Sequence, residues 1–234
     1  GYDCPVCDEH FTVKAVRAGK VKLSSSDVDL RPIYETVDTL KYDAVVCPHC
    51  GFGALTKYFT PNSPTQNKLI RAQISSNYKG MPEVKGIYTY EDAIARHKLA
   101  LVNAVVKRSH ASERAYICLK LAWLTRGQSE DPMLSEADKR ELKVQENEFL
   151  ESAFSGFSQA FSTESMPICG MDELTLTYLM AAVAFELERF DEANRWVGRV
   201  IVSRSANERI KERARRLRDM IKEKQKEETE QNEQ

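Results

Sequence analysis

The chain has 234 residues, of which 42% are hydrophobic and 29% are charged, and its formal net charge is −1. These values are typical of a globular protein and leave room for a small domain followed by a larger one. The near-zero net charge provides no overall basic field to attract nucleic acid, and no apolar run approaches the roughly 18 residues of a membrane-spanning helix.

The first predicted element is a small metal-clipped sheet, which we expect to form a zinc-ribbon domain over residues 1–60. It is enclosed by two short motifs, Cys4-Pro5-Val6-Cys7 and Cys47-Pro48-His49-Cys50-Gly51. Two cysteines two residues apart on a tight turn can present both thiolates to one ion, and two such turns supply the four sulfurs that zinc prefers. The spacing therefore predicts that a structural Zn²⁺ is bound by Cys4, Cys7, Cys47 and Cys50.

Between the two motifs, the pattern predicts short strands. Alternating apolar residues over 11–23, with Gly19 at a turn, indicate a two-strand ribbon. Residues 24–32 are expected to form a polar loop, and residues 42–46 a strand that leads into the second motif. Gly51 suits the tight backbone that follows this motif.

Six cysteines could instead form three disulfides in a secreted protein. The two cysteines outside the motifs, Cys118 and Cys169, are alone in helical or loop sequence. This distribution favours a metal site with reduced thiols, and hence a cytoplasmic location. No leader sequence is visible, although a glycine at residue 1 suggests that a native N-terminal segment has been trimmed. His10 and His49 are the alternative metal ligands, and we expect His49 to point outward.

A proline-bounded polar stretch at residues 60–64 is predicted to link the ribbon to a helical domain over 61–222. A charged loop and helix start is expected at 128–148, and a charged tail at 223–234 is expected to be a frayed helix or disordered. The remaining apolar periodicity predicts helices at 65–78, 90–108, 112–126, 149–162, 172–188, 191–204 and from about 207 onward.

Paired helices separated by short turns are typical of tetratricopeptide repeats. When the repeat is laid on residues 176–201, Met180 and Ala181 fall at the close contact of the first helix and Phe190 falls at the turn. An earlier copy begins at Ala115 and is interrupted by an acidic insertion. The alternative is a generic amphipathic bundle. The expected fold class is therefore α+β, with a zinc ribbon followed by an all-α tetratricopeptide-like array.

This alignment with the repeat also predicts which residues in the first helix of each repeat face the groove. The surface they form is apolar, which suits an amphipathic or extended peptide segment. Alternatively, the chain's own ribbon covers it. The candidate partner-binding residues are Arg114, Ile117, Leu121, Tyr178 and Phe185.

The spacer between the cysteine motifs contains Asp29-Leu30-Arg31-Pro32, followed by Tyr42-Asp43 and the run Val46-Cys47-Pro48-His49-Cys50-Gly51-Phe52. Together with the cysteines, these stretches resemble a bacterial family designated domain of unknown function 2225. The likeness covers essentially the whole chain. It implies a bacterial cytoplasmic protein with a zinc ribbon, tetratricopeptide-like helices and no assigned reaction.

Catalytic motifs are absent from the sequence: we find no phosphate-cradling glycine loop, metalloprotease helix motif or nucleophile elbow. Four thiolates would saturate the metal and leave no position for a catalytic water. His97 lies on an apolar helical face, where a packed, hydrogen-bonded imidazole is expected. An enzyme would need a pocket that holds His97 beside a carboxylate. We therefore expect no enzymatic activity.

The leading hypothesis is a non-enzymatic zinc-binding module that binds another protein or peptide. The alternative is a nucleic-acid-binding zinc ribbon that uses a basic surface around residues 68–108. Residues 61–110 contain eight basic and three acidic residues, a balance of +5. In the last helix, basic and acidic residues are interleaved, which is typical of a solvated face.

Overall fold

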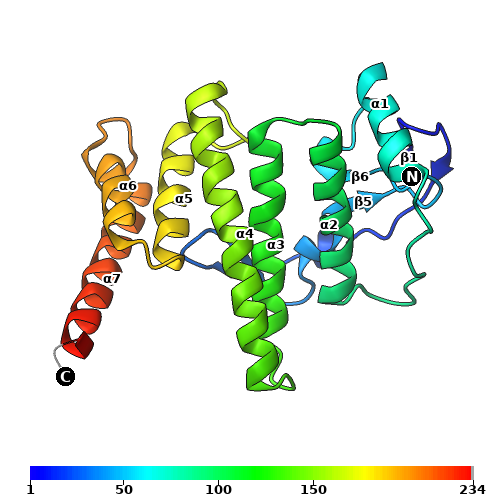
Figure 1. Ribbon diagram of the computed structural model, residues 1–234. Helices are drawn as coiled ribbons and strands as arrows, with labels where there is room; N and C mark the ends of the chain where they lie inside the picture. Colours follow the sequence, from blue (N-terminus) through cyan, green and yellow to red (C-terminus); the bar gives the residue numbers. More distant parts are fainter. Residues whose placement is uncertain (233–234) are drawn as a thin grey trace.

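A computed structural model, which describes residues 1–232, places small antiparallel sheets before a row of helices (Figure 1). The fold class is therefore α+β, as predicted. In the described part of the chain, each sheet has two strands. The pairs are β1 (Tyr2–Asp3) with β2 (His10–Phe11), β3 (Leu23–Ser26) with β4 (Pro32–Tyr34), and β5 (Ala44–Val46) with β6 (Gly53–Leu55).

The ribbon predicted over residues 11–23 is wrong. Gly19 lies in a 3-10 turn, and Leu23 begins β3 and pairs forward with Tyr34 of β4. The serine run expected to be a loop is therefore a strand, and only residues 27–31 form the turn of this hairpin. Serines have little β propensity of their own, so the pairing depends on contacts that the turn makes with distant helices. The strand predicted at 42–46 is present as β5.

The predicted linker at 60–64 ends in a helix cap. The Ser63 hydroxyl accepts a hydrogen bond from the Gln66 N–H at 3.3 Å, and the Gln66 side chain accepts one from the Ser63 N–H at 2.9 Å. This capping box starts helix α1 (Pro64–Ile70), which continues into a π-helical turn, η4 (Arg71–Ser75). The predicted helix at 65–78 is thus two short pieces.

The other helices follow one another across the molecule in chain order (Figure 1). In the described part of the chain, no helix is both long and apolar enough to cross a membrane. Their bounds are α2 (Tyr90–Val106), α3 (Ala111–Ser129), α4 (Glu136–Thr163), α5 (Glu173–Glu186), α6 (Phe190–Val202) and α7 (Glu208–Asn232).

Two charged segments continue into neighbouring helices, in agreement with the helix start expected at 128–148 and with the helix extension expected as one alternative for the tail. Helix α4 begins just after the cap residue Ser135 and runs for 28 residues, so most of the segment 128–148 is continuous with the helix predicted at 149–162. Its charged residues sit at helical spacing, as in the contact of Lys139 with Glu136 at 3.0 Å. The predicted tail at 223–234 continues α7 as far as Asn232; residues 233–234 lie outside the described part.

The buried apolar side chains form two groups. The larger group is the interior of the helices, and Leu40 and Leu55 from the N-terminal part belong to it. The smaller group surrounds the four cysteines and includes Ile70 and Ile74 from α1 and η4. Both groups therefore contain residues from either side of position 60, and the division into domains at that position stays a prediction.

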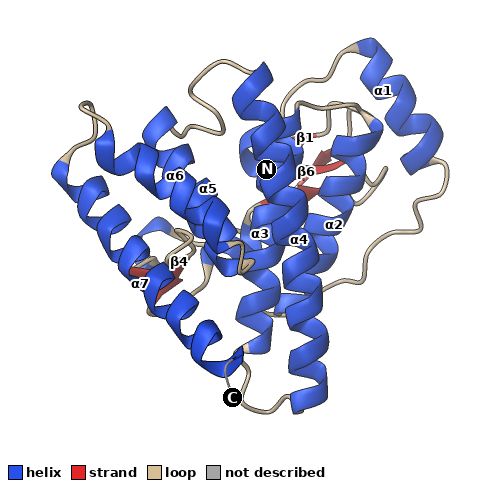
Figure 2. Cartoon of the chain, turned by 60° about the vertical axis from the view of Figure 1, so that its left-hand side comes forward, coloured by secondary structure: helices blue, strands red, loops and turns tan. Residues whose placement is uncertain are grey.

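The turn of the β3–β4 hairpin is inserted among the helices. Figure 2 shows this hairpin beside α7, and Arg213 of α7 donates to the Ser26 hydroxyl at 3.1 Å. On the opposite side, the Tyr178 hydroxyl of α5 donates to the carbonyl of Val28 at 3.0 Å. The N-terminal part of the chain therefore also contacts helices α5 and α7, far from the cysteine motifs.

Candidate metal centre

The two cysteine motifs fold into the same backbone turn. In the first, the Asp8 N–H donates to the Cys4 carbonyl at 2.9 Å; in the second, the Gly51 N–H donates to the Cys47 carbonyl at 3.0 Å. The residue after the second cysteine has a positive φ in both turns, 64° at Asp8 and 73° at Gly51. Such a turn directs both thiols of a motif to the same side, which explains the two-residue spacing.

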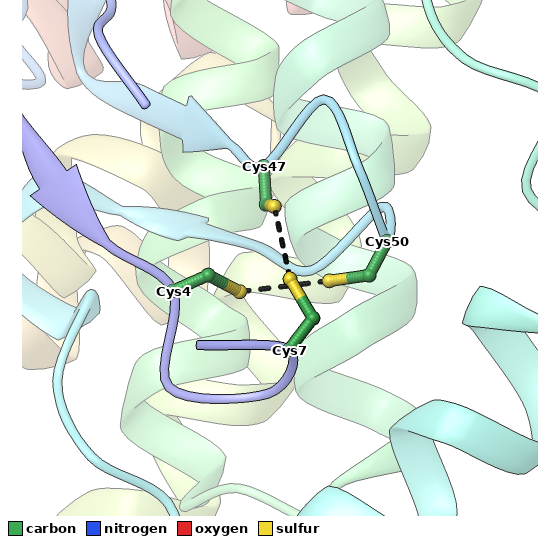
Figure 3. A group of neighbouring side chains, drawn as sticks. All are labelled: Cys4, Cys7, Cys47 and Cys50. Carbon is green, nitrogen blue, oxygen red and sulfur yellow. Dashed lines mark hydrogen bonds between the residues drawn. The ribbon is translucent and has the colours of Figure 1, made fainter. Parts of the chain in front are cut away.

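The two turns face each other, so that the four thiols converge (Figure 3). The sulfurs of Cys4 and Cys50 are 3.5 Å apart, those of Cys7 and Cys47 are 3.7 Å apart, and all four lie within 4.8 Å of one another. Zinc–sulfur bonds of about 2.3 Å in a tetrahedron place the sulfurs about 3.8 Å apart. The cluster could therefore hold a metal ion at its centre.

The thiols are enclosed and affect one another's ionisation. Cys4 and Cys47 are almost fully buried. A hydrogen bond from Cys50 lowers the pKa of Cys4 to about 5, and the same contact raises the pKa of Cys50. Burial raises the pKa of Cys47 to about 11. Without a cation, the group therefore favours one thiolate, whereas a bound divalent ion would deprotonate all four.

The two histidines near the motifs do not join the cluster. His49 is exposed, as expected for a side chain that points away from its turn. His10 is also exposed, and its Nδ1 lies 2.7 Å from a carboxylate oxygen of Asp3. The ligand set that the geometry offers is therefore four thiolates.

The helix residues proposed as a partner surface are mostly covered by the chain itself. Ile117 and Leu121 are fully buried, and Tyr178 is 4% exposed because the turn at 27–31 packs against it. These three residues are not available to a partner in this structure. Phe185 is half-buried beside Phe190, with ring centroids 6.0 Å apart, and Arg114 is half-exposed.

Arg114 lines a different surface, which we call the α2–α4 groove. This groove has a volume of about 630 Å³ and runs between α2 and α4 over the face of α3. Its apolar rim includes Val105, which is 53% exposed, and its floor contains Ala115 and Gly156. Among the described residues, no carboxylate lies within ion-pair distance of Arg114.

The main polar cluster of the structure was not found from the sequence. Arg126 of α3 contacts Asp29 at 2.9 Å and Glu146 of α4 at 2.7 Å, and the Trp123 indole also donates to Asp29 at 2.9 Å. Asp29 is fully buried. The stretch from Asp29 to Pro32 was noticed as part of the spacer, but nothing in its spacing indicates a partner 97 residues away.

His97 is a packed core residue. It is fully buried, and its Nδ1 lies 2.8 Å from the carbonyl of Ala93. Burial lowers the pKa of His97 to about 4, so the imidazole is neutral at physiological pH. His97 lines neither the α2–α4 groove nor the cavity of about 620 Å³ between the N-terminal part of the chain and helices α3 and α5.

Comparisons with known proteins give one match. A model of a protein family described as "Uncharacterized protein conserved in bacteria (DUF2225)" matches residues 1–223. Searches of curated proteins and of solved structures each found no match. The family match spans the cysteine motifs, the buried Asp29 cluster and all but the end of α7.

Proposed function

This chain belongs to the bacterial DUF2225 family, and we propose that it is a non-enzymatic zinc-binding module that binds another protein. The observation that carries the proposal is the convergence of four thiols and no other ligand group. A four-thiolate site is closed, with no open position for water or substrate, and such sites stabilise folds rather than catalyse reactions.

Zinc would add to the small core at the cysteine end of the chain. The strands there are two or three residues long, and the buried apolar group around them is much smaller than the one within the helices. Such short strands have marginal stability by themselves, and binding of a metal ion supplies folding free energy directly. Among the described residues, all six cysteines are free thiols, which supports a reducing, cytoplasmic location.

We further propose that the helices form a tetratricopeptide-like array. Helices α3 and α4 form one hairpin, α5 and α6 form a second, and α7 covers the end. The positions assigned to close contacts support this, because Met180 and Ala181 are fully buried and Phe190 is buried at the turn. Between α3 and α4, a Cβ at Gly156 would meet the Cβ of Ala115 at 2.8 Å, which shows that these helices approach closely.

The partner surface that the structure supports is the α2–α4 groove. Its apolar rim, small-residue floor and unpaired Arg114 suit an amphipathic helix that carries an acidic side chain. Among the described residues, the one carboxylate in its lining belongs to Glu151, which pairs with Arg189 at 2.9 Å. The groove therefore offers one free positive charge within an apolar surface, and an acidic amphipathic segment complements it.

Metal analysis tests the zinc centre. We expect one zinc ion per purified chain and no visible absorption of the kind that iron–thiolate centres give. Cys47→Ser should lose the metal and the order of the cysteine end, while helical circular dichroism is largely retained. Cys118→Ser removes another buried thiol outside the cluster and should keep the zinc. A wild-type chain without stoichiometric metal would contradict the proposal.

Affinity capture from the bacterial host, followed by mass spectrometry, tests the partner surface. Proteins retained by the wild type should be lost with Arg114→Glu and retained with Arg140→Glu, which reverses an exposed charge on α4 outside the groove. Equal capture by both variants would show that the groove is not the binding surface.

The nucleic-acid alternative has less support. Within the basic region, Lys107 is buried against Glu113 at 2.9 Å, and the Arg71 guanidinium donates to the carbonyl of Val6 at 3.0 Å. These cations are therefore committed to contacts within the chain. Binding of RNA or DNA with a steep salt dependence would nevertheless overturn the protein-partner proposal.

A further inference from the structure

A cavity of about 620 Å³ lies between the N-terminal part of the chain and helices α3 and α5. Protein interiors are close-packed, and voids much larger than a water molecule are few. A volume of this size is instead typical of pockets for small organic molecules, which occupy roughly 300–1,000 Å³. The lining of the cavity shares no residue with the cysteine cluster or the α2–α4 groove, and it borders the Asp29 cluster at Trp123, whose indole donates to Asp29.

The walls of this cavity are largely apolar and aromatic. The inner wall consists of buried side chains of α3 and α5, including Leu119, Trp123 and Leu179. The mouth is formed by the segment at residues 13–21, where Ala15 and Val21 are exposed. The lining also includes several tyrosines, namely Tyr2, Tyr34, Tyr42 and Tyr116.

One charged pair is built into the inner wall. Lys120 of α3 is 6% exposed, its ammonium lies 2.5 Å from a carboxylate oxygen of Asp43, and it sits 4.6 Å from the ring centre of Tyr116. An ammonium has three N–H donors, and Asp43 is the one carboxylate within ion-pair distance of it among the described residues. Burial lowers the pKa of Lys120, but Asp43 and Tyr116 together raise it above the ordinary value, so the ammonium is charged.

The lining contains three charged residues. Lys120 and Asp43 neutralise each other, and the third is Lys14. The Lys14 ammonium is directed out of the cavity, because it donates to the carbonyls of Val84 at 2.6 Å and of Gly86, and neither residue lines the cavity. Among the described residues, Lys120 is therefore the lining ammonium that is placed to donate to a ligand.

We propose that this cavity binds a small organic monoanion with a flat, apolar body, such as an aromatic carboxylate. The body fits among Leu119, Trp123 and Leu179, and the carboxylate accepts a hydrogen bond from an N–H of Lys120 that Asp43 does not use. Placing an ammonium in the interior costs free energy, and an apolar side chain of similar size would pack α3 without that cost. A ligand whose carboxylate accepts a hydrogen bond from this ammonium would explain why a lysine occupies position 120.

Fluorescence of Trp123 provides the test, because this indole lines the cavity. The other tryptophan, Trp196, packs edge-on against Phe161 with a centroid separation of 5.7 Å, and Trp196→Phe removes its signal. The probes are benzoate, indole-3-acetate and naphthalene-2-carboxylate, each paired with its neutral amide. We expect saturable changes in Trp123 emission for at least one carboxylate, with binding about tenfold or more tighter than for the amide.

Two variants in the Trp196→Phe background distinguish binding inside the cavity from binding elsewhere on the protein. Thr175→Phe adds a ring to the lining without touching Lys120, and it should abolish binding while the protein stays folded. Lys120→Met should remove the preference for the carboxylate over the amide. Absence of saturable binding for all three carboxylates, or binding that Thr175→Phe leaves unchanged, would overturn the proposal and identify the cavity as a solvent-filled space.

Discussion

The Asp29 carboxylate and the Arg126 guanidinium form a two-point contact in the interior, with nitrogen–oxygen distances of 2.9 and 3.2 Å. The two residues are 97 positions apart. Asp29 comes from the turn of the β3–β4 hairpin and Arg126 from the last turn of α3. This contact fixes the N-terminal part of the chain to the helices, and it explains why a serine-rich segment forms a strand.

We expect Asp29→Asn to lower the free energy of unfolding by about 3 kcal/mol, because it leaves a largely buried guanidinium without one of its charge partners. Urea denaturation measures this change. Glu136→Gln is the control, since Glu136 pairs with Lys139 on the surface and its loss should cost less than about 0.5 kcal/mol. In a double-mutant cycle, Asp29→Asn should cost much less in the Arg126→Met background; equal costs in both backgrounds would show that the contact contributes nothing.

The backbone of the cysteine turns leads to a second prediction. Gly51 has φ of 73°, and a Cβ there would meet the ring of Tyr78 at 2.6 Å. Gly51→Ala should therefore lower stability by about 2 kcal/mol and weaken metal retention against a competing chelator. Asp8 occupies the equivalent place with φ of 64°, so Asp8→Gly should be neutral or stabilising. Equal losses for both variants would contradict the equivalence of the two turns.

Two glycines within helices should respond to alanine in opposite directions. Gly198 in α6 has open space around it, so Gly198→Ala should raise stability by about 0.5–1 kcal/mol through helix propensity. Gly156 in α4 faces the Cβ of Ala115 at 2.8 Å, so Gly156→Ala should destabilise despite the same propensity gain. Thermal unfolding of both variants measures the difference. Stabilisation by both would contradict the close approach of α3 and α4.

Acid should destabilise the fold through His97. Its pKa is about 4 in the folded chain, against an ordinary value of 6.5, because burial disfavours the charged imidazole. Between these values the unfolded state binds more protons, so the contribution is fully present above pH 6.5 and is lost as the pH falls toward 4. The loss amounts to about 3 kcal/mol.

Comparison of the wild type with His97→Leu isolates this contribution. Both proteins keep the four cysteines, so loss of metal in acid affects them alike. The difference in unfolding free energy between them should shrink by about 3 kcal/mol from pH 7 to pH 4, as measured by urea denaturation at each pH. The exposed His110→Gln variant controls for loss of an imidazole. A difference that does not change with pH would show that His97 is not held neutral by burial.

Much of the fold could be predicted because its signals are local. Helices α2, α3, α5 and α6 follow from apolar periodicity, and their ends lie within a few residues of the predicted ones. The helix start expected within the charged segment 128–148 is present from Glu136 onward, and charges at helical spacing continue it into the helix predicted at 149–162. The helix predicted at 65–78 is instead divided between α1 and η4. The hairpin predicted over residues 11–23 was wrong because the actual pairing of β3 with β4 depends on the helices around its turn.

By itself, the sequence determined the four candidate metal ligands, because the backbone turn of each Cys-Pro-x-Cys motif sets the position of its two thiols within a few residues. It also determined that the chain is α+β. Only the tertiary structure decided that Ile117, Leu121 and Tyr178 are covered, that Asp29 reaches Arg126, and that Lys120 lines a cavity beside Asp43. These contacts join residues tens of positions apart. Such pairs meet only where the packing of several elements brings them together, and a local sequence pattern does not predict that packing.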